Sequence, residues 1–220
     1  MSVNKYPLLV FDWDGTLMDS INHIVDALQH AMHETGVEVL ERQRSKDIIG
    51  LGMREAIVAL FPDSSNDESF IQQYAQHYKE YYHEPGRVTE LYEGARELLQ
   101  NLKSDGYTLA IATGKGRPGL NRVLQQTGLG YLFEVSRCAD ETQSKPHPAM
   151  IEEILKETNY AADQAIMIGD TEYDLEMASK ANVKSIGASY GVHDEARLLK
   201  HKPIGIIKNI IELSHLLKKV

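Results

Sequence analysis

An apolar stretch that runs directly into two acidic residues constrains the fold of this chain more than any other feature. Residues 8–11 are Leu, Leu, Val and Phe, and Asp12 and Asp14 follow on either side of Trp13. A short, continuous apolar run that ends in turn residues is typical of a buried strand of a parallel sheet. Ligands of open α/β sheets bind at the carboxyl ends of such strands. The stretch therefore predicts a site at the end of this strand.

Asp12 and Asp14 stand two positions apart, so on an extended chain their side chains share one side and can face the same crevice. Gly15 follows them and permits a sharp turn. A purely structural interpretation is also open, in which Asp14 and Gly15 form only a turn and Asp12 is a solvated neighbour. Placement directly after an apolar strand favours the functional interpretation.

Composition and charge exclude several classes of protein. The net charge of −9 argues against nucleic acid as a partner, because phosphate backbones are bound by clustered Lys and Arg. It also argues against an anionic membrane surface. No apolar run approaches the roughly 18 residues of a membrane span, so we expect a cytoplasmic location. Cys138 is the only cysteine, which fits a reducing compartment, and a small buried side chain is a better interpretation for it than a nucleophile.

Helices and strands alternate from about residue 90 to the last residue. Alternation of this kind predicts right-handed βαβ units and an α/β fold, a doubly wound parallel sheet (Rossmann-like) with helices on both faces. We expect strands at 107–112, 133–138, 164–168, 184–187 and 204–207, and helices at 93–104, 117–127, 147–158, 172–180, 194–200 and 209–219.

Residues 18–89 differ from the rest, because their apolar residues recur at helical spacing and no convincing strand occurs. We therefore expect one α/β core domain, residues 1–17 and 90–220, interrupted by a small all-helical cap domain, residues 18–89. The first helix of the insert should cover 19–35, capped by Asp19 or Ser20. A stripe of tyrosines on its last helix is interpreted as a packing face rather than a ligand site.

Polar residues follow the other predicted strands where a site would need them. Strand 107–112 leads into Thr113, Gly114 and Lys115, which offer a hydroxyl, a flexible backbone amide and a cation. Together these groups suit an anion. The loop after the next strand carries Lys145.

Asp170 and Asp174 follow the strand at 164–168 and surround a helix start. Asp170 could be a mere N-cap of that helix. If all the strand ends meet, however, these two acids join Asp12 and Asp14 with little more than Lys145 to oppose them. Two like charges about 4 Å apart repel by roughly 4 kcal/mol at an effective dielectric of 20, so the cluster needs a cation. Oxygen ligands without His or Cys indicate Mg²⁺.

One motif points elsewhere. Residues 114–119 form a literal GxGxxG after a strand and before a helix, which taken alone suggests a dinucleotide fold. That fingerprint usually lies on the first βαβ unit with an acid about 20 residues further on, and here only Asp140 lies near that distance. We favour the anion site.

The motifs in this order resemble the haloacid dehalogenase superfamily, and within it the phosphoglycolate phosphatase-like branch with a helical cap. The matching residues are Phe11-Asp12-Trp13-Asp14-Gly15-Thr16-Leu17 with Asp19-Ser20, then Thr113, Lys145-Pro146, and Gly169-Asp170-Thr171 with Asp174. The motifs span most of the chain.

This resemblance implies a Mg²⁺-dependent phosphatase that hydrolyses small phosphorylated metabolites through an aspartyl-phosphate intermediate. Asp12 would be the covalent nucleophile and Asp14 the general acid and base. The resemblance further implies phosphate binding by Thr113, Gly114 and Lys145, and metal binding by Asp12, Asp14 (through its backbone carbonyl), Asp170 and Asp174.

Other activities stay open. A dehalogenase has little use for Asp14 or for Mg²⁺. Related phosphomutases carry a His ten residues after the second Asp, where this chain has Ile24, with His23 one place earlier. A non-catalytic phospho-aspartate signalling or binding module also combines acids, Mg²⁺, Thr and Lys, but it usually lacks a helical insert. For His23, a place on the helix surface is the simpler interpretation.

The substrate itself is not identified by the sequence: phosphoglycolate, a sugar phosphate and a nucleotide monophosphate all fit, and the oligomeric state is unknown. Specificity would come from the cap, which can close over the crevice. The loop 50–54 is the candidate segment, where Arg54 could hold a distal carboxylate or phosphate. Lys115 is a second candidate.

Overall fold

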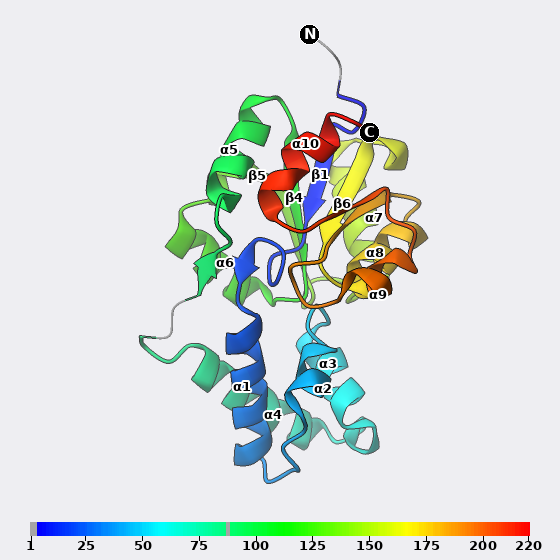
Figure 1. Ribbon diagram of the computed structural model, residues 1–220. Coiled ribbons are helices and arrows are strands. Elements are labelled where there is room, and N and C mark those ends of the chain that lie inside the picture. Colours follow the sequence, from blue (N-terminus) through cyan, green and yellow to red (C-terminus); the bar gives the residue numbers. More distant parts are fainter. Residues whose placement is uncertain (1–3, 87–88) are drawn as a thin grey trace.

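Strand β1, Leu8–Phe11, lies in the middle of a parallel six-stranded sheet in this computed structural model, which describes residues 4–86 and 89–220 (Figure 1). The strand order is β5-β4-β1-β6-β7-β8. Val10 is in register with Ala110 of β4 on one side and with Met167 of β6 on the other. The other strands are β4 (Thr108–Thr113), β5 (Phe133–Cys138), β6 (Ala165–Gly169), β7 (Lys184–Ala188) and β8 (Gly205–Ile207).

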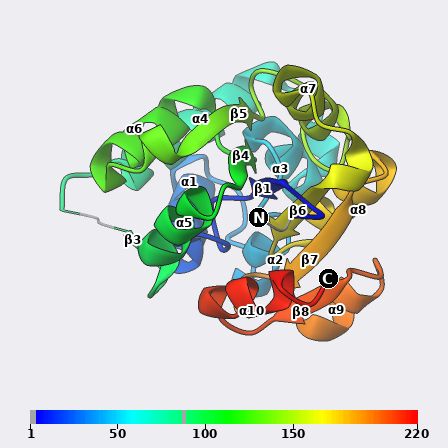
Figure 2. The same ribbon diagram turned by 90° about the horizontal axis from the view of Figure 1, so that it is seen from above.

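Helices cover both faces of this sheet, because alternate residues of each buried strand supply an apolar surface to each side. Leu9 and Phe11 pack in one cluster, and Leu8 and Val10 pack in the other. The first cluster includes residues of α5 (Ala95–Ser104), α6 (Arg117–Thr127) and α10 (Leu213–Leu217), and the second includes residues of α7 (Ala149–Thr158) and α8 (Glu172–Lys180). Figure 2 shows the two sets of helices on opposite sides of the sheet, which confirms the predicted doubly wound α/β class.

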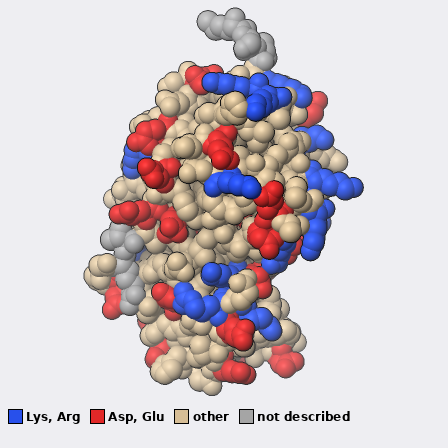
Figure 3. Space-filling model, viewed as in Figure 1, with Lys and Arg blue, Asp and Glu red and all other residues tan. Residues whose placement is uncertain are grey.

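Four helices form a separate layer beyond the carboxyl ends of the strands, and the molecule narrows where the two parts meet (Figures 1 and 3). They have an apolar core of their own, in which the buried Tyr74 donates a hydrogen bond of 2.8 Å to the carbonyl of Leu28. The helical layer consists of α1 (Ile21–Glu34), α2 (Arg42–Lys46), α3 (Met53–Leu60) and α4 (Glu68–Tyr82), with a short 3₁₀ helix, η1 (Pro62–Ser64).

Two short strands that the sequence did not reveal connect this helical layer to the sheet. β2 (Met18–Asp19) pairs antiparallel with β3 (Glu90–Leu91), so the entry and exit of the layer run side by side. Strands of two residues carry no detectable alternation of polar and apolar residues. The predicted domain boundaries fall at this pair, and the division into two domains stays a prediction.

Two other expectations need correction. Ser20 is the N-cap of α1, but its side chain makes no capping hydrogen bond, because its hydroxyl is bound to Asp14. The helix expected at 209–219 is shorter and begins as a 3₁₀ turn, η4 (Ile210–Glu212), ahead of α10. The remaining elements are α9 (Glu195–Leu199) and two 3₁₀ turns, η2 (Gly130–Leu132) and η3 (Ala162–Gln164).

Cys138 is fully buried at the end of β5, and burial raises the pKa of its thiol to about 12. It is therefore a packing residue, as expected. None of the helices in the described part of the chain combines the length and the apolarity that a membrane crossing requires. On the face in Figure 3, acidic and basic side chains are interspersed.

Substitution of a β1 residue tests how far the fold depends on this strand. Leu9 is fully buried, so Leu9→Ala should lower the free energy of unfolding by about 2–5 kcal/mol through lost contacts and a residual cavity. Leu199, which is 51% exposed, gives the matched control, and Leu199→Ala should change stability by less than about 0.5 kcal/mol. Urea unfolding measures both. Equal effects of the two changes would contradict the central place of β1.

Candidate active site

Asp12, Asp170 and Asp174 come together at the carboxyl ends of β1 and β6. The backbone N–H of Asp12 donates to the carbonyl of Ile168 at 2.9 Å, which joins the two strand ends. Each of the three acids offers a carboxylate oxygen, and these oxygens all lie within 4.8 Å of one another. The side chains are almost completely buried. The adjacent parallel strands therefore bring residues more than 150 positions apart in sequence into one cluster.

Lys145 is the one cation inside this cluster among the described residues. Its Nζ lies 2.8 Å from Oδ1 of Asp12 and 2.6 Å from Oδ1 of Asp174, and its side chain is fully buried. It comes from the loop between β5 and α7, as the sequence predicted. One positive charge thus faces three carboxylates.

The charge imbalance is reflected in the proton affinities. Burial raises the pKa of Asp12 to about 7, and Lys145 offsets only part of this while Asp174 adds to it. Burial also raises the pKa of Asp170 well above its usual range, and the neighbouring Asp12 and Asp174 raise it further. Burial opposes the charged form of Lys145, yet the two carboxylates beside it hold its pKa above the usual range. The cluster as it stands therefore lacks positive charge.

Asp170 is held by groups from two other segments of the chain. Its Oδ1 accepts a 2.7 Å hydrogen bond from the hydroxyl of Thr16, and its Oδ2 accepts one of 2.8 Å from the backbone N–H of Val192. Gly15, with φ of +80°, passes so close that a Cβ there would overlap the Asp170 carboxylate. Asp170 is not the N-cap of α8, since Thr171 takes that position. The interpretation of Asp170 as the N-cap of this helix is therefore wrong.

Asp174 has a structural and an electrostatic role together. Its Oδ2 accepts hydrogen bonds from the backbone N–H and the hydroxyl of Thr171, at 3.1 Å and 2.7 Å, which forms a capping box at the start of α8. Its other oxygen faces Lys145. Oδ2 is thus fixed by the capping box, and Oδ1, which accepts no hydrogen bond among the described residues, is the oxygen that faces the cluster.

The donor set fits a hard divalent cation. Oδ2 of Asp12 is buried and has no hydrogen-bond partner in the described part of the chain. A buried carboxylate oxygen left without a partner is costly, and a cation would satisfy it. The three residues offer oxygen ligands alone, which Mg²⁺ prefers.

Asp14 points away from the other acids, toward the helical layer. Its Oδ1 accepts a 2.5 Å hydrogen bond from the hydroxyl of Ser20, and its Oδ2 lies 2.9 Å from Nζ of Lys115. Lys115 also donates to the hydroxyl of Tyr82 at 3.0 Å and lies 4.7 Å from the centre of that ring. The carboxylate of Asp14 is thus placed apart from the metal-type cluster, at the contact between the sheet and the helical layer.

Thr113 and Gly114 end β4 beside the acids. Thr113 is fully buried, and its hydroxyl oxygen accepts a 3.2 Å hydrogen bond from the backbone N–H of Lys115. At Gly114, a Cβ would meet the carbonyl oxygen of Leu51 at 2.6 Å, so only glycine allows the helical layer to approach this closely. The backbone N–H of Gly52 also donates to the Ser144 hydroxyl at 2.7 Å. The loop 50–54 therefore covers the strand ends.

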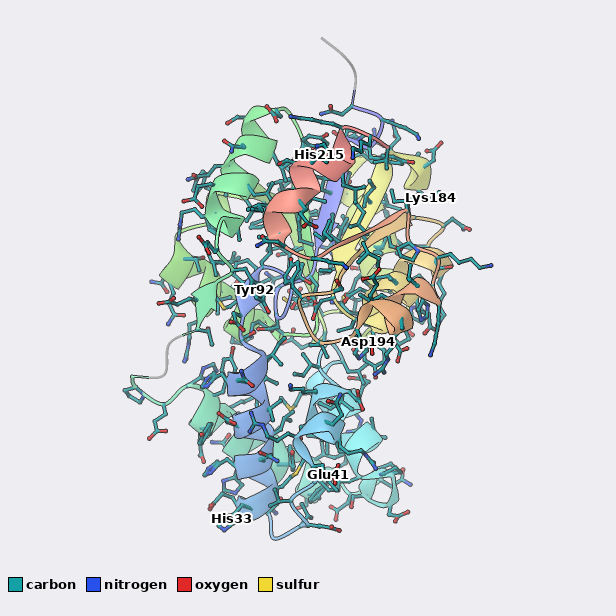
Figure 4. All side chains as sticks on the ribbon, viewed as in Figure 1. His33, Glu41, Tyr92, Lys184, Asp194 and His215 are labelled. Atoms are coloured by element: carbon teal, nitrogen blue, oxygen red, sulfur yellow. The ribbon has the colours of Figure 1, made fainter. Side chains whose placement is uncertain are left out.

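A cavity of about 640 Å³ lies between the strand ends and the helical layer. Its walls include Asp12, Asp14, Thr113, Gly114 and Lys115, the predicted residues of β1 and β4. The stick view shows side chains from both parts filling the region around it (Figure 4).

The structure gives the two predicted cap residues different surroundings. Arg54 borders the cavity, but its guanidinium is paired with Glu68 on the surface of the helical layer. His23 is not a free surface residue: its Nε2 lies 2.9 Å from the carbonyl oxygen of Tyr82, and the two rings are 4.4 Å apart. His23 therefore joins α1 to the end of α4.

The dinucleotide interpretation of residues 114–119 finds no support. The backbone N–H of Arg117, at the start of α6, donates to both carboxylate oxygens of Asp140 at 2.9 and 3.0 Å. The N-terminus that would have received a pyrophosphate is thus already bound by an acid of the same chain. In a dinucleotide-binding fold, an acid at about the position of Asp140 would bind the ribose hydroxyl, so Asp140 cannot serve that role here while it binds the start of α6.

Several side chains of the site were not named from the sequence in these roles. Thr16 and Ser20 bind Asp170 and Asp14, and Tyr82, which belongs to the stripe predicted as a packing face, reaches Lys115. Thr16 and Ser20 follow the opening acids closely, so proximity was an available signal for them. No local signal links Tyr82 with Lys115, which lies 33 residues further on.

Comparison with known proteins agrees with this geometry. Residues 9–188 match the family described as haloacid dehalogenase-like hydrolase. The chain therefore belongs to that family, and it is an enzyme of the phosphatase type, as predicted.

Relatives cover almost the whole chain. It is 34% identical to the probable phosphatase IndB of Dickeya dadantii (strain 3937), covering 94% of this chain and 91% of that protein. It is 30% identical to pyrophosphatase PpaX of Bacillus pumilus (strain SAFR-032), over 97% of each, and 29% identical to a phosphoglycolate phosphatase of Colwellia psychrerythraea (strain 34H / ATCC BAA-681), over 87% and 88%. A crystal structure of a predicted phosphatase from Clostridium acetobutylicum superposes with a TM-score of 0.87 at 25% identity, covering 98% and 99% of the two chains.

Gly15→Ala tests the close approach to Asp170. Gly15 and Gly36 both have positive φ, +80° and +73°, but nothing lies within 4 Å of a Cβ at Gly36. Both substitutions should therefore destabilise the protein by about 1–2 kcal/mol through backbone strain. Gly15→Ala alone should also displace the Asp170 carboxylate and lower phosphate release at least about tenfold. Equal activity of the two variants would contradict a role of Gly15 in placing Asp170.

The raised pKa of Asp12 predicts a pH-dependent stability in the absence of divalent cations. The unfolded carboxyl group releases its proton near 3.8, but the folded one holds it to about 7. The folded state therefore binds more protons within this window, and stability falls as the pH rises through it.

With a chelator present, the free energy of unfolding of wild type should fall relative to that of Asp12→Asn between pH 4 and pH 7, and the two should change alike below that window. Urea unfolding at several pH values measures this, with Asp63→Asn, on an exposed side chain, as the control. The prediction would be refuted if the difference in unfolding free energy between wild type and Asp12→Asn were the same at every pH.

Proposed function

We propose that this protein is a Mg²⁺-dependent phosphatase of small phosphorylated metabolites that acts through an aspartyl-phosphate on Asp12. One observation carries the proposal: the buried Oδ2 of Asp12 has no hydrogen-bond partner in the described part of the chain, while Asp12 lines the cavity and contacts Lys145. A buried carboxylate with one oxygen held by a fixed cation and the other without a hydrogen-bond partner is suited both to share a metal ion and to attack an electrophilic phosphorus. The family membership supports the same reaction class.

Asp12 and Asp170 would hold the Mg²⁺ directly, with the backbone carbonyl of Asp14 as a further ligand and Asp174 behind them. The ion would supply positive charge to the transferring phosphoryl group and would offset the repulsion among the carboxylates. Thr113, the backbone of Gly114 and Lys145 would bind the remaining phosphoryl oxygens. The family resemblance implies the same set of residues.

The proposed reaction has two steps, in which Asp12 forms and breaks the bond to phosphorus and Asp14 transfers the protons. A carboxylate oxygen of Asp12 attacks the phosphorus, a new O–P bond forms and the bond from phosphorus to the leaving-group oxygen breaks. Asp14 gives its proton to that oxygen, so an alcohol leaves. Asp14 next takes a proton from water, whose oxygen attacks the phosphorus and releases Asp12 and inorganic phosphate. The net reaction is hydrolysis of the ester.

The helical layer would act as the cap, residues 18–89, over the core of residues 1–17 and 90–220. In the described structure it lies against the core through several contacts, among them the bond of Gly52 to Ser144 and that of Lys115 to Tyr82. Such a cover excludes water from the phosphoryl group and presents its own side chains to the leaving group. The relatives' names suggest compact substrates, phosphoglycolate or pyrophosphate, for this chain too.

Phosphate release measured with purified protein tests the proposal. Wild type should hydrolyse a generic aryl phosphate with Mg²⁺, lose this activity with EDTA and regain it when Mg²⁺ is restored. Asp12→Asn should lower kcat at least about 1,000-fold, because the attacking oxygen is lost. Asp14→Asn should slow both steps, and after an acid quench it should carry phosphate on Asp12, detectable by mass spectrometry.

Asp63→Asn serves as the control, with unchanged activity. Full activity of Asp12→Asn, or no phosphate release from the aryl phosphate and a panel of metabolites, would overturn the proposal. Transfer of phosphate to a second hydroxyl of the substrate, rather than to water, would indicate a phosphomutase.

A further inference from the structure

The mouth of the cavity carries three basic side chains that the proposed chemistry does not use. Lys79 and His83 come from the end of α4, and Arg122 comes from α6. All three line the cavity and are exposed to solvent. Lys79 and His83 are four residues apart and share one face of the helix end. Arg122 follows Gly119, another lining residue, by three positions and so also faces the cavity.

The two helices face each other across the opening. The hydrogen bond from Lys115 to Tyr82 joins the loop before α6 to the last turn of α4, and Figure 2 shows both helices on the same side of the molecule. The pKa of His83 supports this closeness, since partial burial and the charges of Arg122 and Lys115 lower it below its usual range. The basic groups therefore act on one volume rather than on separate surfaces.

Lys79 and Arg122 have no ion pair or side-chain hydrogen bond within the part of the chain that the structure describes. Most other arginines in the described part of the chain are paired, for example Arg54 with Glu68, Arg117 with Glu141, and Arg197 with Asp47, whereas Arg44 and Arg96 are not. Four acids line the same cavity. Asp12, Asp14 and Asp140 already contact Lys145, Lys115 and the start of α6, and Glu55 has no ion pair within the described residues. In a chain with net charge −9, two unpaired cations at one opening indicate an anionic ligand.

Lys79 and Arg122 lie on the side of the cavity where the leaving group of a bound substrate would be. Asp12 and Thr113 are the buried residues of the cavity wall, and Lys145 contacts Asp12 from behind. The phosphoryl group would bind there, so the rest of the substrate would extend toward the opening. Lys115 is not free to neutralise a second charge there, since it is bound to Asp14 and Tyr82. A neutral alcohol would leave Lys79 and Arg122 without a function in binding.

We propose that Arg122, with Lys79 and His83, forms a subsite for a second anionic group, a carboxylate or a phosphate, on the leaving-group side of the substrate. The subsite selects compact two-anion substrates over phosphate esters of neutral alcohols. It rests on the proposed function, because it assigns the substrate class of the same cavity. Arg54, the residue favoured from the sequence for this role, is occupied by Glu68.

Two pairs of substrates isolate the second charge. The first pair is 2-phosphoglycolate and 2-hydroxyethyl phosphate, in which a carboxylate is replaced by a neutral hydroxymethyl group. The second pair is pyrophosphate and methyl phosphate, in which a second phosphate is replaced by a neutral methyl group. The measured quantity is kcat/KM of each variant relative to wild type on the same substrate, which cancels the intrinsic reactivity of each compound. The variants are Arg122→Gln and Lys79→Gln, singly and together.

Matched controls remove charge elsewhere on the surface. Arg44→Gln changes an exposed arginine of the helical layer that does not line the cavity, and Lys184→Gln changes an exposed lysine at the start of β7, far from the helical layer (Figure 4). Both should leave every kcat/KM unchanged. Circular dichroism and melting temperature confirm that each variant is folded.

Each single variant should lower kcat/KM about two- to fivefold on the substrates with a second anion, the range for an exposed ion pair, and the double variant about tenfold. The rates on 2-hydroxyethyl phosphate and methyl phosphate should stay within a factor of two. Loss on 2-phosphoglycolate alone would assign the subsite to a carboxylate, and loss on pyrophosphate alone would assign it to a phosphate.

Equal losses on charged and neutral substrates, or no loss on any, would overturn the subsite while leaving the phosphatase intact. Failure of wild type to release phosphate from all four compounds and from the aryl phosphate would instead overturn the proposed function. The two failures are therefore distinguishable.

Discussion

The repulsion among three buried carboxylates is the constraint on which the rest of the site depends. Asp12, Asp170 and Asp174 are brought together by backbone geometry, and Lys145 supplies only one compensating charge. The structure tolerates this because each acid has its own support: a strand end, the Thr16 and Val192 donors, or the capping box of α8. The remaining negative charge is not compensated, so the site favours binding of a cation. A bound cation is also what stabilises a transferring phosphoryl group.

Much of the core could be predicted from the sequence, because its signals are local. Buried parallel strands are apolar runs, and the polar residues that follow them carry the chemistry, so the strand ends at Asp12, Thr113 and Asp170 could be identified from their neighbours in the chain alone. The handedness of βαβ units then restricts how such strands can be connected. The helix at 117–127 was predicted with its observed bounds, since Gly116 and Gly128 flank it.

The contacts between the helical layer and the sheet could not be predicted in the same way. The hydrogen bond between Lys115 and Tyr82 and the close passage of Leu51 over Gly114 depend on how two separately formed surfaces meet. No residue spacing in the sequence indicates which residues of the two surfaces come into contact. Ser20 shows a different limit: it stands at the N-cap position of α1, but its hydroxyl donates to Asp14, a nearby residue in the sequence, instead of capping the helix.

The pairing of β2 with β3 has a mechanical consequence. Both connections to the helical layer pass through this small ladder, with Met18 opposite Leu91, so the layer is attached by two hydrogen-bonded segments rather than by two independent linkers. Ser20 directly follows β2, and its hydroxyl donates to the carboxylate of Asp14. A bend at the β2–β3 pair would therefore reach Asp14 through Ser20. Any displacement of the helical layer would therefore act on the hydrogen bond that positions Asp14.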